Sequence, residues 1–459
     1  MSRRHGQLLL GKENMNNQLI TELKDLRTKI DALVQNYCEI KYAEEKFDFE
    51  ADPVPVSGKV IGFPEISNMV SASLDGWLTT GRFNDEFERK LGHFLNVKHV
   101  LTVNSGSSAN LVAFSTLTSH KLGNRAIKPG DEVIGVAAGF PTTINPQIQS
   151  GVIPVFVDVD LETHNVDVSK LEEALSPKTK AVMLAHALGN PFNAQKVRDF
   201  CTKHNLWLIE DCCDALGAKH NGSLVGSFGD IATLSFYPAH HITMGEGGAV
   251  FTNNDELAVI AESYRDWGRD CYCKTGCDNT CNKRFEWSLG QLPYGYDHKY
   301  IYSHCGYNLK ISDMQAACGL AQLDKLDDFI KKRNSNFDFL MSRLGTLKDF
   351  FILPAATENS EPSWFGFPLS LRDGTHFTRE ELLRFLDQEK IGTRLVFAGN
   401  VTKQPYFTET KIKFRISGQL TNTDKVMENS FWIGLYPGLT EAHLEKTCSK
   451  IEEFLGLNF

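Results

Sequence analysis

Two adjacent histidines between two predicted strands are the side chains best suited to move a proton. His240 and His241 follow an apolar strand predicted over 231–236, and a glycine-rich turn then leads into a second strand, 249–252. The reference pKa of imidazole lies near neutral pH, so a positioned histidine can serve as a general base. The segment therefore predicts proton-transfer chemistry, with His240 and His241 as alternative bases.

A second group of reactive side chains is a run of closely spaced cysteines. Cys271, Cys273, Cys277 and Cys281 fall within eleven residues, and Cys213 lies upstream. Four thiolates can hold zinc or an iron–sulfur cluster. Structural zinc usually shows paired Cys-x-x-Cys turns, which this stretch lacks. Five other cysteines are expected to be structural: Cys38, Cys201, Cys305, Cys318 and Cys448.

Three further motifs follow predicted strands and suit a planar anionic ligand. Ser105, Gly106 and Ser107 open a helix, where backbone N–H groups bind anions, although a capped helix would look similar. Phe140 can stack on a planar ring or simply pack in the core. Asp211 ends a strand, and a buried carboxylate there needs a partner, such as a pyridinium nitrogen, unless it only caps a helix.

The elements that would position these residues form an alternating pattern of short apolar runs and helical segments. Such a pattern indicates a mostly parallel sheet covered by helices on both faces. Seven runs are predicted to be its strands: 99–103, 132–137, 154–159, 181–187, 206–209, 231–236 and 249–252. We therefore expect a large α/β domain over residues 60–320.

The two ends of the chain differ from this central pattern. Residues 1–14 are expected to be a disordered lead, and 17–42 an amphipathic helix, so 1–59 is predicted as a lead and helical arm. Residues 308–335 carry one long helical pattern. A smaller C-terminal α/β domain is predicted over 321–459, with helices such as 379–389 and 441–455, the second opening after Thr440.

Composition excludes several broad classes of function. The chain has 459 residues, a formal net charge of -9 and a pI near 5.9, which argues against generic nucleic-acid binding and against a polybasic membrane surface. No apolar run is long enough to cross a bilayer. We expect a cytoplasmic protein without nucleic-acid or membrane partners, whose cysteines stay free of disulfides.

The order of these motifs resembles the nucleotide-sugar aminotransferases, fold-type-I enzymes that use pyridoxal phosphate (PLP). The resemblance rests on the phosphate loop, Phe140, Asp211, Ser235 and the Gly-Glu-Gly-Gly turn at 245–248, and extends from about residue 60 to the C-terminus. It implies a mostly parallel seven-stranded sheet and a phosphate contact from Ser235. It also implies that Asn308 reaches the phosphate of the neighbouring subunit, and hence a homodimer. The implied cofactor-binding residues are Ser105, Gly106, Ser107, Phe140, Asp211, Ser235 and Asn308.

One departure from the family pattern changes the expected chemistry. His240 occupies the position of the family's Schiff-base lysine. The resemblance then implies a cofactor held non-covalently as pyridoxamine phosphate (PMP), with His240, favoured over His241 by its place in the motif, as the base. A His-for-Lys exchange of this kind is typical of the sugar 3-dehydrases that make 3,6-dideoxyhexoses for O-antigen and lipopolysaccharide. Dehydration next to a ketone would replace amino transfer.

The cysteine spacing narrows the resemblance further. Cys213, Cys271, Cys273 and Cys281 form the pattern Cys-x57-Cys-x-Cys-x7-Cys, which is similar to that of the CDP-4-dehydro-6-deoxyglucose 3-dehydrases, members of the family that carry a 2Fe–2S cluster. These four are the implied cluster ligands, with Cys277 as a spare and Cys212 as the alternative to its neighbour. The resemblance also implies a CDP-linked 4-keto-6-deoxyhexose substrate and an NADH-dependent flavin/iron–sulfur reductase that supplies single electrons.

Three other interpretations remain open at this stage. One is a cluster-free dehydratase that regenerates PMP with glutamate, one a non-catalytic dimeric sensor that retains the pocket, and one a zinc-stabilised aminotransferase. The nucleotide, the sugar stereochemistry and the final dideoxysugar are not fixed by the sequence. Candidate contacts to the nucleotide diphosphate or the sugar are Lys59, Arg269, Lys283, Arg284, Arg394, Tyr237 and His241.

Overall fold

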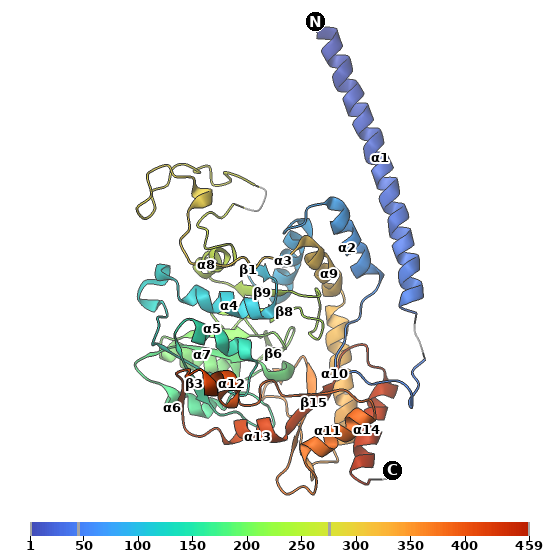
Figure 1. Cartoon of the computed structure of the whole chain (residues 1–459), viewed down its shortest axis with the longest axis vertical. Coiled ribbons are helices and arrows are strands. Elements are labelled where there is room, and N and C mark those ends of the chain that lie inside the picture. Colours follow the sequence, from blue (N-terminus) through green and yellow to red (C-terminus); the bar gives the residue numbers. More distant parts are fainter. Residues whose placement is uncertain (1, 44–45, 274–276, 458–459) are drawn as a thin grey trace.

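An eight-stranded sheet forms the centre of the protein, whose computed structural model describes residues 2–43, 46–273 and 277–457 (Figure 1). The strand order is β1-β9-β8-β5-β4-β2-β3-β14, and only β9 runs against the others. The strands are β1 (His99–Val103), β9 (Gly248–Thr252), β8 (Ile231–Ser235), β5 (Trp207–Asp211), β4 (Thr179–Ala185), β2 (Glu132–Val136), β3 (Ile153–Val157) and β14 (Arg415–Ile416). All seven predicted runs are strands, and β14 is the additional one.

Helices cover both faces of this sheet because its strands are apolar on both sides. Met183 packs toward α4 and α8, whereas its neighbours Val182 and Leu184 pack toward α6 and α7. The alternation follows from the two-residue period of a strand. The helices of this part are α3 (Arg82–Leu95), α4 (Gly106–Leu117), α5 (Pro141–Gln149), α6 (Leu171–Ala174), α7 (Ala194–Lys203), α8 (Asp255–Arg265) and α9 (Asp313–Leu323), with short 3-10 turns at His120–Arg125, Val168–Lys170 and Ala187–Gly189.

The C-terminal part is built on a four-stranded antiparallel sheet. Its order is β10 (Phe351–Ile352), β12 (Gly366–Leu371), β15 (Ser430–Gly434) and β13 (Thr393–Leu395). The single helix predicted over 308–335 is wrong: two helices, α9 and α10 (Leu326–Leu344), meet near Lys325, and Asn308 lies outside both. The other helices are α11 (Arg379–Gln388), α12 (Pro405–Glu409), α13 (Thr421–Asn429) and α14 (Glu441–Phe454), with a 3-10 turn at Val401–Lys403.

The two parts of the structure do not correspond to two separate stretches of sequence. β14 lies within the segment predicted as the smaller domain, yet it extends the large sheet beside β3. A small three-stranded sheet also joins β11 (Ser360–Glu361) to β6 (Lys219–His220) and β7 (Ser223–Leu224). The domain limits at residues 59/60 and 320/321 therefore stay predictions.

The N-terminal arm is one long helix, α1 (Ser2–Lys41), which packs on α2 (Phe63–Asp75) and extends away from the body (Figure 1). Arg27 donates to Asp75 at 2.7 Å across this contact. The disordered lead predicted over 1–14 is wrong for residues 2–14, because the helix already begins at Ser2. None of the described helices is both long and apolar enough to cross a membrane.

The cysteine-rich stretch belongs to a long excursion between α8 and α9, named here the cysteine segment, residues 266–308. Among its described residues the only helix or strand is a 3-10 turn, His298–Tyr300. Bridges between Asp266 and Asn308 and between Arg269 and Tyr302 close its base. In Figure 1 it stands off the body beyond α8. Lys274–Gly276, inside the predicted cluster loop 271–281, lie outside the described residues.

Candidate active site

The start of α4 lies at the carboxyl edge of the sheet and forms one end of the group of predicted cofactor-binding residues there, named here the cofactor pocket. Ser105 is the N-cap, and its Oγ accepts from Ser108 N at 3.0 Å. A Cβ added at Gly106 would lie 2.8 Å from Ser235 Oγ and 3.1 Å from Cys213 Sγ, so only glycine fits. The predicted Ser105–Ser107 loop and Ser235 are thereby brought together, with free backbone N–H groups at a helix start that suit a phosphate.

Asp211 forms the other end of the pocket. Its Oδ2 accepts from Asn110 Nδ2 and from Thr143 Oγ1, both at 2.7 Å, and its Oδ1 accepts from Cys213 N at 3.1 Å. Thr233 Oγ1 donates to Asn110 Oδ1 at 2.7 Å, which turns the amide's N–H toward the carboxylate. A buried carboxylate held this way can still bond a cationic ring nitrogen. Sequence reasoning missed Asn110 and Thr143 as partners, although both stand in the predicted motifs.

Phe140 supplies an aromatic face between these two ends of the pocket. It is the residue before α5, follows β2, and is 51% exposed. Its ring lies nearly perpendicular to that of Phe397, with centroids 6.4 Å apart, and about half of the side chain remains exposed to another planar group. The position suits the predicted stacking on a ring.

His240 lies on the turn after β8 and faces a carboxylate. Its Nδ1 is 3.4 Å from Asp214 Oδ1 and has no hydrogen-bond partner among the described side chains. Burial chiefly, and the charge of Arg333 next, lower the pKa of His240 to about 4. Burial and the charge of Asp211 raise the pKa of Asp214 to about 8. His240 is therefore neutral at neutral pH and able to accept a proton.

His241 is held by a hydrogen bond to the C-terminal part of the chain. It is buried, and its Nε2 bonds the carbonyl oxygen of Ser363 at 2.9 Å. A buried imidazole with this bond has one ring nitrogen already engaged. The geometry thus favours His240 over His241 as the base.

A buried arginine that sequence reasoning missed fixes the histidine turn. Arg333 of α10 donates to the carbonyl oxygens of Ala239, His240 and Phe365, each at 3.1 Å. Burial lowers its pKa to about 10. Because Arg333 lies 93 positions from His240 in sequence, within an ordinary helical pattern, no local signal marks it.

These residues fit a phosphorylated pyridine cofactor that is not covalently attached. The helix start suits its phosphate, Phe140 its ring face and Asp211 its ring nitrogen. The stretch from Ile231 to Thr252 contains no lysine.

Asn308 lies at the base of the cysteine segment, next to the phosphate loop of its own chain. Asn104 N donates to Leu309 O at 2.8 Å, and Lys310 Nζ donates to Asn308 Oδ1 at 3.1 Å. Its contact with a neighbouring subunit's phosphate stays a prediction.

Three of the four predicted cluster ligands gather around one small cavity. Cys271, Cys273 and Cys281 line it, together with Asp278, Asn279, Arg284, His298 and Lys299. Although burial opposes it, hydrogen bonds led by that of the Thr280 hydroxyl, 3.1 Å from the sulfur, lower the pKa of Cys273 to about 7. A lowered thiol pKa favours the thiolate that binds metal.

Cys213 does not line that cavity, so the described residues do not bring the four predicted cluster ligands together around it. Its sulfur lies instead by Gly106 in the cofactor pocket, where burial raises the pKa of the thiol. Cys277, the predicted spare, is exposed and does not line the cavity either. The 57 residues between Cys213 and Cys271 explain why spacing alone did not reveal the separation.

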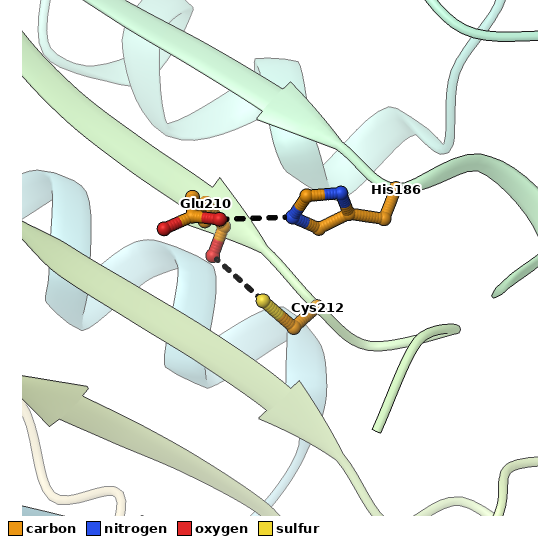
Figure 2. Close-up of side chains that lie close together, drawn as sticks. All are labelled: His186, Glu210 and Cys212. Atoms are coloured by element: carbon orange, nitrogen blue, oxygen red, sulfur yellow. Dashed lines mark hydrogen bonds and ion pairs between the residues drawn. The ribbon is translucent and has the colours of Figure 1, made fainter. Parts of the chain in front are cut away.

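Cys212, the alternative to Cys213, belongs to a separate buried group with His186 and Glu210 (Figure 2). Their ligand atoms lie within 4.8 Å of one another. His186 Nδ1 accepts from Phe192 N at 3.2 Å, so its Nε2 carries the proton and donates to Glu210 at 3.0 Å. Glu210 also accepts from the backbone N–H groups of Gly226 and Gly229. Each group is satisfied without a metal, which marks a structural network.

The candidate contacts to a nucleotide are dispersed over the chain. Arg284 is held by a two-pronged ion pair with Asp297, at 2.6 and 2.9 Å, and Arg269 stacks over Trp267. Arg394 donates to its neighbouring Thr393 carbonyl. Three predicted contacts are exposed side chains without an assigned partner: Lys59, Lys283 and Tyr237.

The fold and the pocket define a fold-type-I, PLP-dependent aminotransferase-like α/β protein. The sequence pattern of the DegT/DnrJ/EryC1/StrS aminotransferase family matches residues 62–452, and the chain belongs to this family.

Two relatives in sequence cover nearly the whole chain. One is the lipopolysaccharide biosynthesis protein RfbH of Salmonella typhimurium (strain LT2), 62% identical over 95% of this chain and 99% of the relative. Another is the dTDP-4-dehydro-2,6-dideoxy-D-glucose 3-dehydratase of Saccharopolyspora spinosa, 47% identical over 94% and 92%.

Among solved structures, an E. coli GDP-4-keto-6-deoxy-D-mannose-3-dehydratase with bound hydrated PLP is similar. It has a TM-score of 0.78 and 26% identity over 87% of this chain and 99% of that one. A second structure of a GDP-4-keto-6-deoxymannose-3-dehydratase, with a trapped PLP-glutamate geminal diamine, has a TM-score of 0.75 and 27% identity over 86% and 99%.

Proposed function

We propose that this protein is a PMP- and 2Fe–2S-dependent dehydrase that removes the C-3 hydroxyl of a CDP-linked 4-keto-6-deoxyhexose. The product would serve 3,6-dideoxyhexose synthesis for O-antigen and lipopolysaccharide. The observation that carries the proposal is a neutral, half-buried histidine, His240, where a Schiff-base lysine would stand, beside the other residues predicted to bind the cofactor. Two 3-dehydratases among the relatives support the same reaction class, and a lipopolysaccharide biosynthesis protein supports the same kind of pathway.

In this proposal His240 removes a proton at the reacting centre and returns it during dehydration. Its Nδ1 lies 3.4 Å from Asp214 Oδ1, so the single proton of the neutral imidazole would be held on Nδ1, facing that oxygen. The other ring nitrogen, Nε2, would then carry no proton and would accept the substrate-derived one. Arg333 positions the turn that carries His240 through two of its backbone carbonyls.

The cofactor-binding residues are Ser105, Gly106, Ser107, Phe140, Asp211, Ser235 and Asn308. When bound, PMP supplies an amine that condenses with the sugar ketone and a ring that accepts electrons. Asp211 would keep the ring nitrogen protonated and the ring electron-poor, and Phe140 would hold the ring in plane. The bound PLP of the E. coli relative supports this class of cofactor.

The cluster would be held by Cys213, Cys271, Cys273 and Cys281, and it would pass electrons one at a time. An NADH-dependent flavin/iron–sulfur reductase would supply them. A homodimer, in which Asn308 reaches the neighbouring phosphate, completes the proposal. The gathering of three of the four cysteines around one cavity supports the cluster.

A second candidate function is a cluster-free 3-dehydratase that regenerates PMP with glutamate. The PLP-glutamate geminal diamine in a structurally similar 3-dehydratase favours it. The exposed and half-buried cysteines of the cysteine segment would then have no catalytic part.

The deciding experiment measures iron and acid-labile sulfide per chain on anaerobically purified protein, with visible spectra before and after dithionite. We expect near-stoichiometric pairs of iron and sulfide and bleaching on reduction. Turnover of a CDP-4-keto-6-deoxyhexose should then depend on NADH and a reductase and not on glutamate. Iron-free protein that resists anaerobic reconstitution and turns over with glutamate would establish the second candidate instead.

A further inference from the structure

The predicted cluster ligands lie at opposite ends of helix α4. Cys213 Sγ lies 3.1 Å from where a Cβ of Gly106, the first residue of α4, would be. The cysteine cavity lies beyond the other end of that helix. There, Asp270, the neighbour of Cys271, accepts from Lys121 Nζ at 2.9 Å, and Lys121 follows the end of α4.

Two further contacts fix the cysteine segment to the far end of α4. His304 bonds Ser119 Oγ at 2.7 Å, just beyond the last residue of the helix. His298, which lines the cysteine cavity, bonds Asp270 Oδ1 at 2.9 Å.

The separation is too large for one chain to complete the cluster. α4 contains 12 residues, Gly106–Leu117, and at a rise of about 1.5 Å per residue its ends are roughly 16 Å apart. All ligands of a two-iron cluster must reach one of two adjacent iron atoms.

The cysteine segment also carries an apolar surface that its own chain leaves open. It has little regular structure, yet seven of its aromatic side chains are between 42% and 74% exposed. Aromatic residues at this density are typical of a surface covered by another protein. The seven are Trp267, Tyr272, Phe285, Tyr294, Tyr296, Tyr300 and Tyr302.

We propose that the cluster is shared between two copies of this chain: Cys271, Cys273 and Cys281 of one subunit bind it together with Cys213 of the partner subunit. The inference rests on the proposed iron–sulfur function. The aromatic surface of the segment would lie on the second copy. A two-fold axis makes the same contact twice, so a dimer holds two such sites.

The arrangement places the cluster beside the partner's cofactor. Cys213 N donates to Asp211, the predicted partner of the cofactor ring nitrogen, and the Cys213 sulfur abuts Gly106 at the predicted phosphate site. A cluster on this sulfur would be adjacent to the reacting ring. In the dimer, Cys271, Cys273 and Cys281 would thus lie beside a cofactor that they do not reach within their own chain.

Complementation between two cysteine variants tests the proposal. Cys213→Ser and Cys281→Ser chains, carrying different affinity tags, are co-expressed, and the mixed dimer is isolated by two successive affinity steps and reconstituted anaerobically. In the shared arrangement the Cys213→Ser chain contributes an intact trio and the Cys281→Ser chain an intact Cys213, so one of two sites is complete. We expect half the wild-type iron and sulfide per dimer and half the electron paramagnetic resonance signal after reduction.

The matched control is a mixed dimer of Cys271→Ser and Cys281→Ser chains, in which neither trio is intact and no cluster should form. Thermal melting of each dimer checks that the variants are folded. If the Cys213→Ser/Cys281→Ser dimer is as iron-free as this control while wild type is loaded, the site is assembled within one chain and the proposal is wrong. Full iron in the Cys213→Ser homodimer would also overturn it. Iron-free wild-type protein would instead overturn the cluster itself.

Discussion

The cofactor pocket and the cysteine segment are built by opposite means. In the pocket, Asp211 and Ser235 stand at the ends of neighbouring strands, and Gly106 and Asn110 on a helix packed against them. The cysteine segment is held at its base by two isolated β-bridges and has one 3-10 turn among its described residues. The residues at the strand ends are brought together within one chain, whereas a loop that cannot bury its aromatic side chains requires another surface.

The difference also appears in how polar groups are satisfied. Asp211 receives three hydrogen bonds from groups that are themselves fixed. In the segment, the cavity around Cys271 and Cys273 is ringed by charged side chains whose ion pairs lie near the surface, such as Arg284 with Asp297. We therefore expect substitutions in the pocket to change cofactor binding or proton transfer directly and strongly. Substitutions in the cysteine segment should instead change cluster binding and the contact with the partner subunit.

The largest expected effect is that of His240→Asn. Removing the general base should slow solvent hydrogen exchange at the bound cofactor by about 100- to 10,000-fold. Exchange is followed by NMR or mass spectrometry in deuterated water. His376→Asn, at an exposed histidine, is the matched control and should leave the rate unchanged. Exchange at the wild-type rate in His240→Asn would show that His240 is not the general base.

Asp211→Asn should weaken cofactor binding by about 10- to 100-fold, because it replaces a charge-assisted hydrogen bond to the ring nitrogen by a neutral one. A fluorescence titration with PMP measures the dissociation constant. Asp255→Asn, at an exposed carboxylate, serves as control. Unchanged PMP affinity in Asp211→Asn would show that the ring nitrogen lies elsewhere.

Gly106→Ala tests the close packing at the phosphate end. The added methyl group would press on Ser235 and Cys213, and overpacking of this kind costs about 1–3 kcal/mol. Both the free energy of unfolding, from urea titration, and PMP affinity should fall. At Gly139 an added Cβ would lie 3.7 Å from its nearest neighbour, so Gly139→Ala should cost less. Equal effects of the two substitutions would contradict this account.

His240 and Asp214 are expected to change the free energy of unfolding with pH in opposite directions. The pKa of His240 falls from 6.5 to about 4 on folding. Between these two pH values the unfolded chain binds more protons than the folded chain, so the free energy of unfolding decreases as the pH falls. The pKa of Asp214 rises from 3.8 to about 8, so its contribution is lost as pH rises.

Urea unfolding of cofactor-free protein between pH 4.5 and 8 measures both contributions. Asp214→Asn should lose less stability than wild type as the pH is raised. His240→Asn should lose less than wild type as the pH is lowered. Parallel stability curves for all three proteins would show that these groups titrate normally.

The smallest effect is expected for Cys277→Ser. Cys277 is exposed and does not line the cysteine cavity, so iron and sulfide per chain should equal those of wild type. Cys273→Ser, four residues earlier in the sequence, should lose the cluster. Loss of iron in Cys277→Ser would place it among the ligands and break the assigned set.

The sequence was informative wherever a residue stands at the end of a regular element. Asp211 and Ser235 each follow apolar runs whose two-residue period is readable, and parallel strands bring their carboxyl ends to one edge. Asp214 and Arg333 were missed because their partners are distant in sequence, and only the packed fold sets them face to face. The position of Cys213 relative to the other cysteines was equally unreadable, since the chain from 266 to 308 has no periodicity to fix its path.

Arg333 has a further consequence for how the protein fails when heated. α10 contributes Phe337 and Leu340 to the core of the C-terminal sheet, while Arg333 on the same helix holds the turn of His240. Asp211 and the phosphate loop, by contrast, belong to the large sheet. Melting of the C-terminal sheet would release the base while leaving the cofactor's own anchors in place. Heat inactivation should therefore precede cofactor loss and pass through a species that still binds PMP but no longer exchanges its protons.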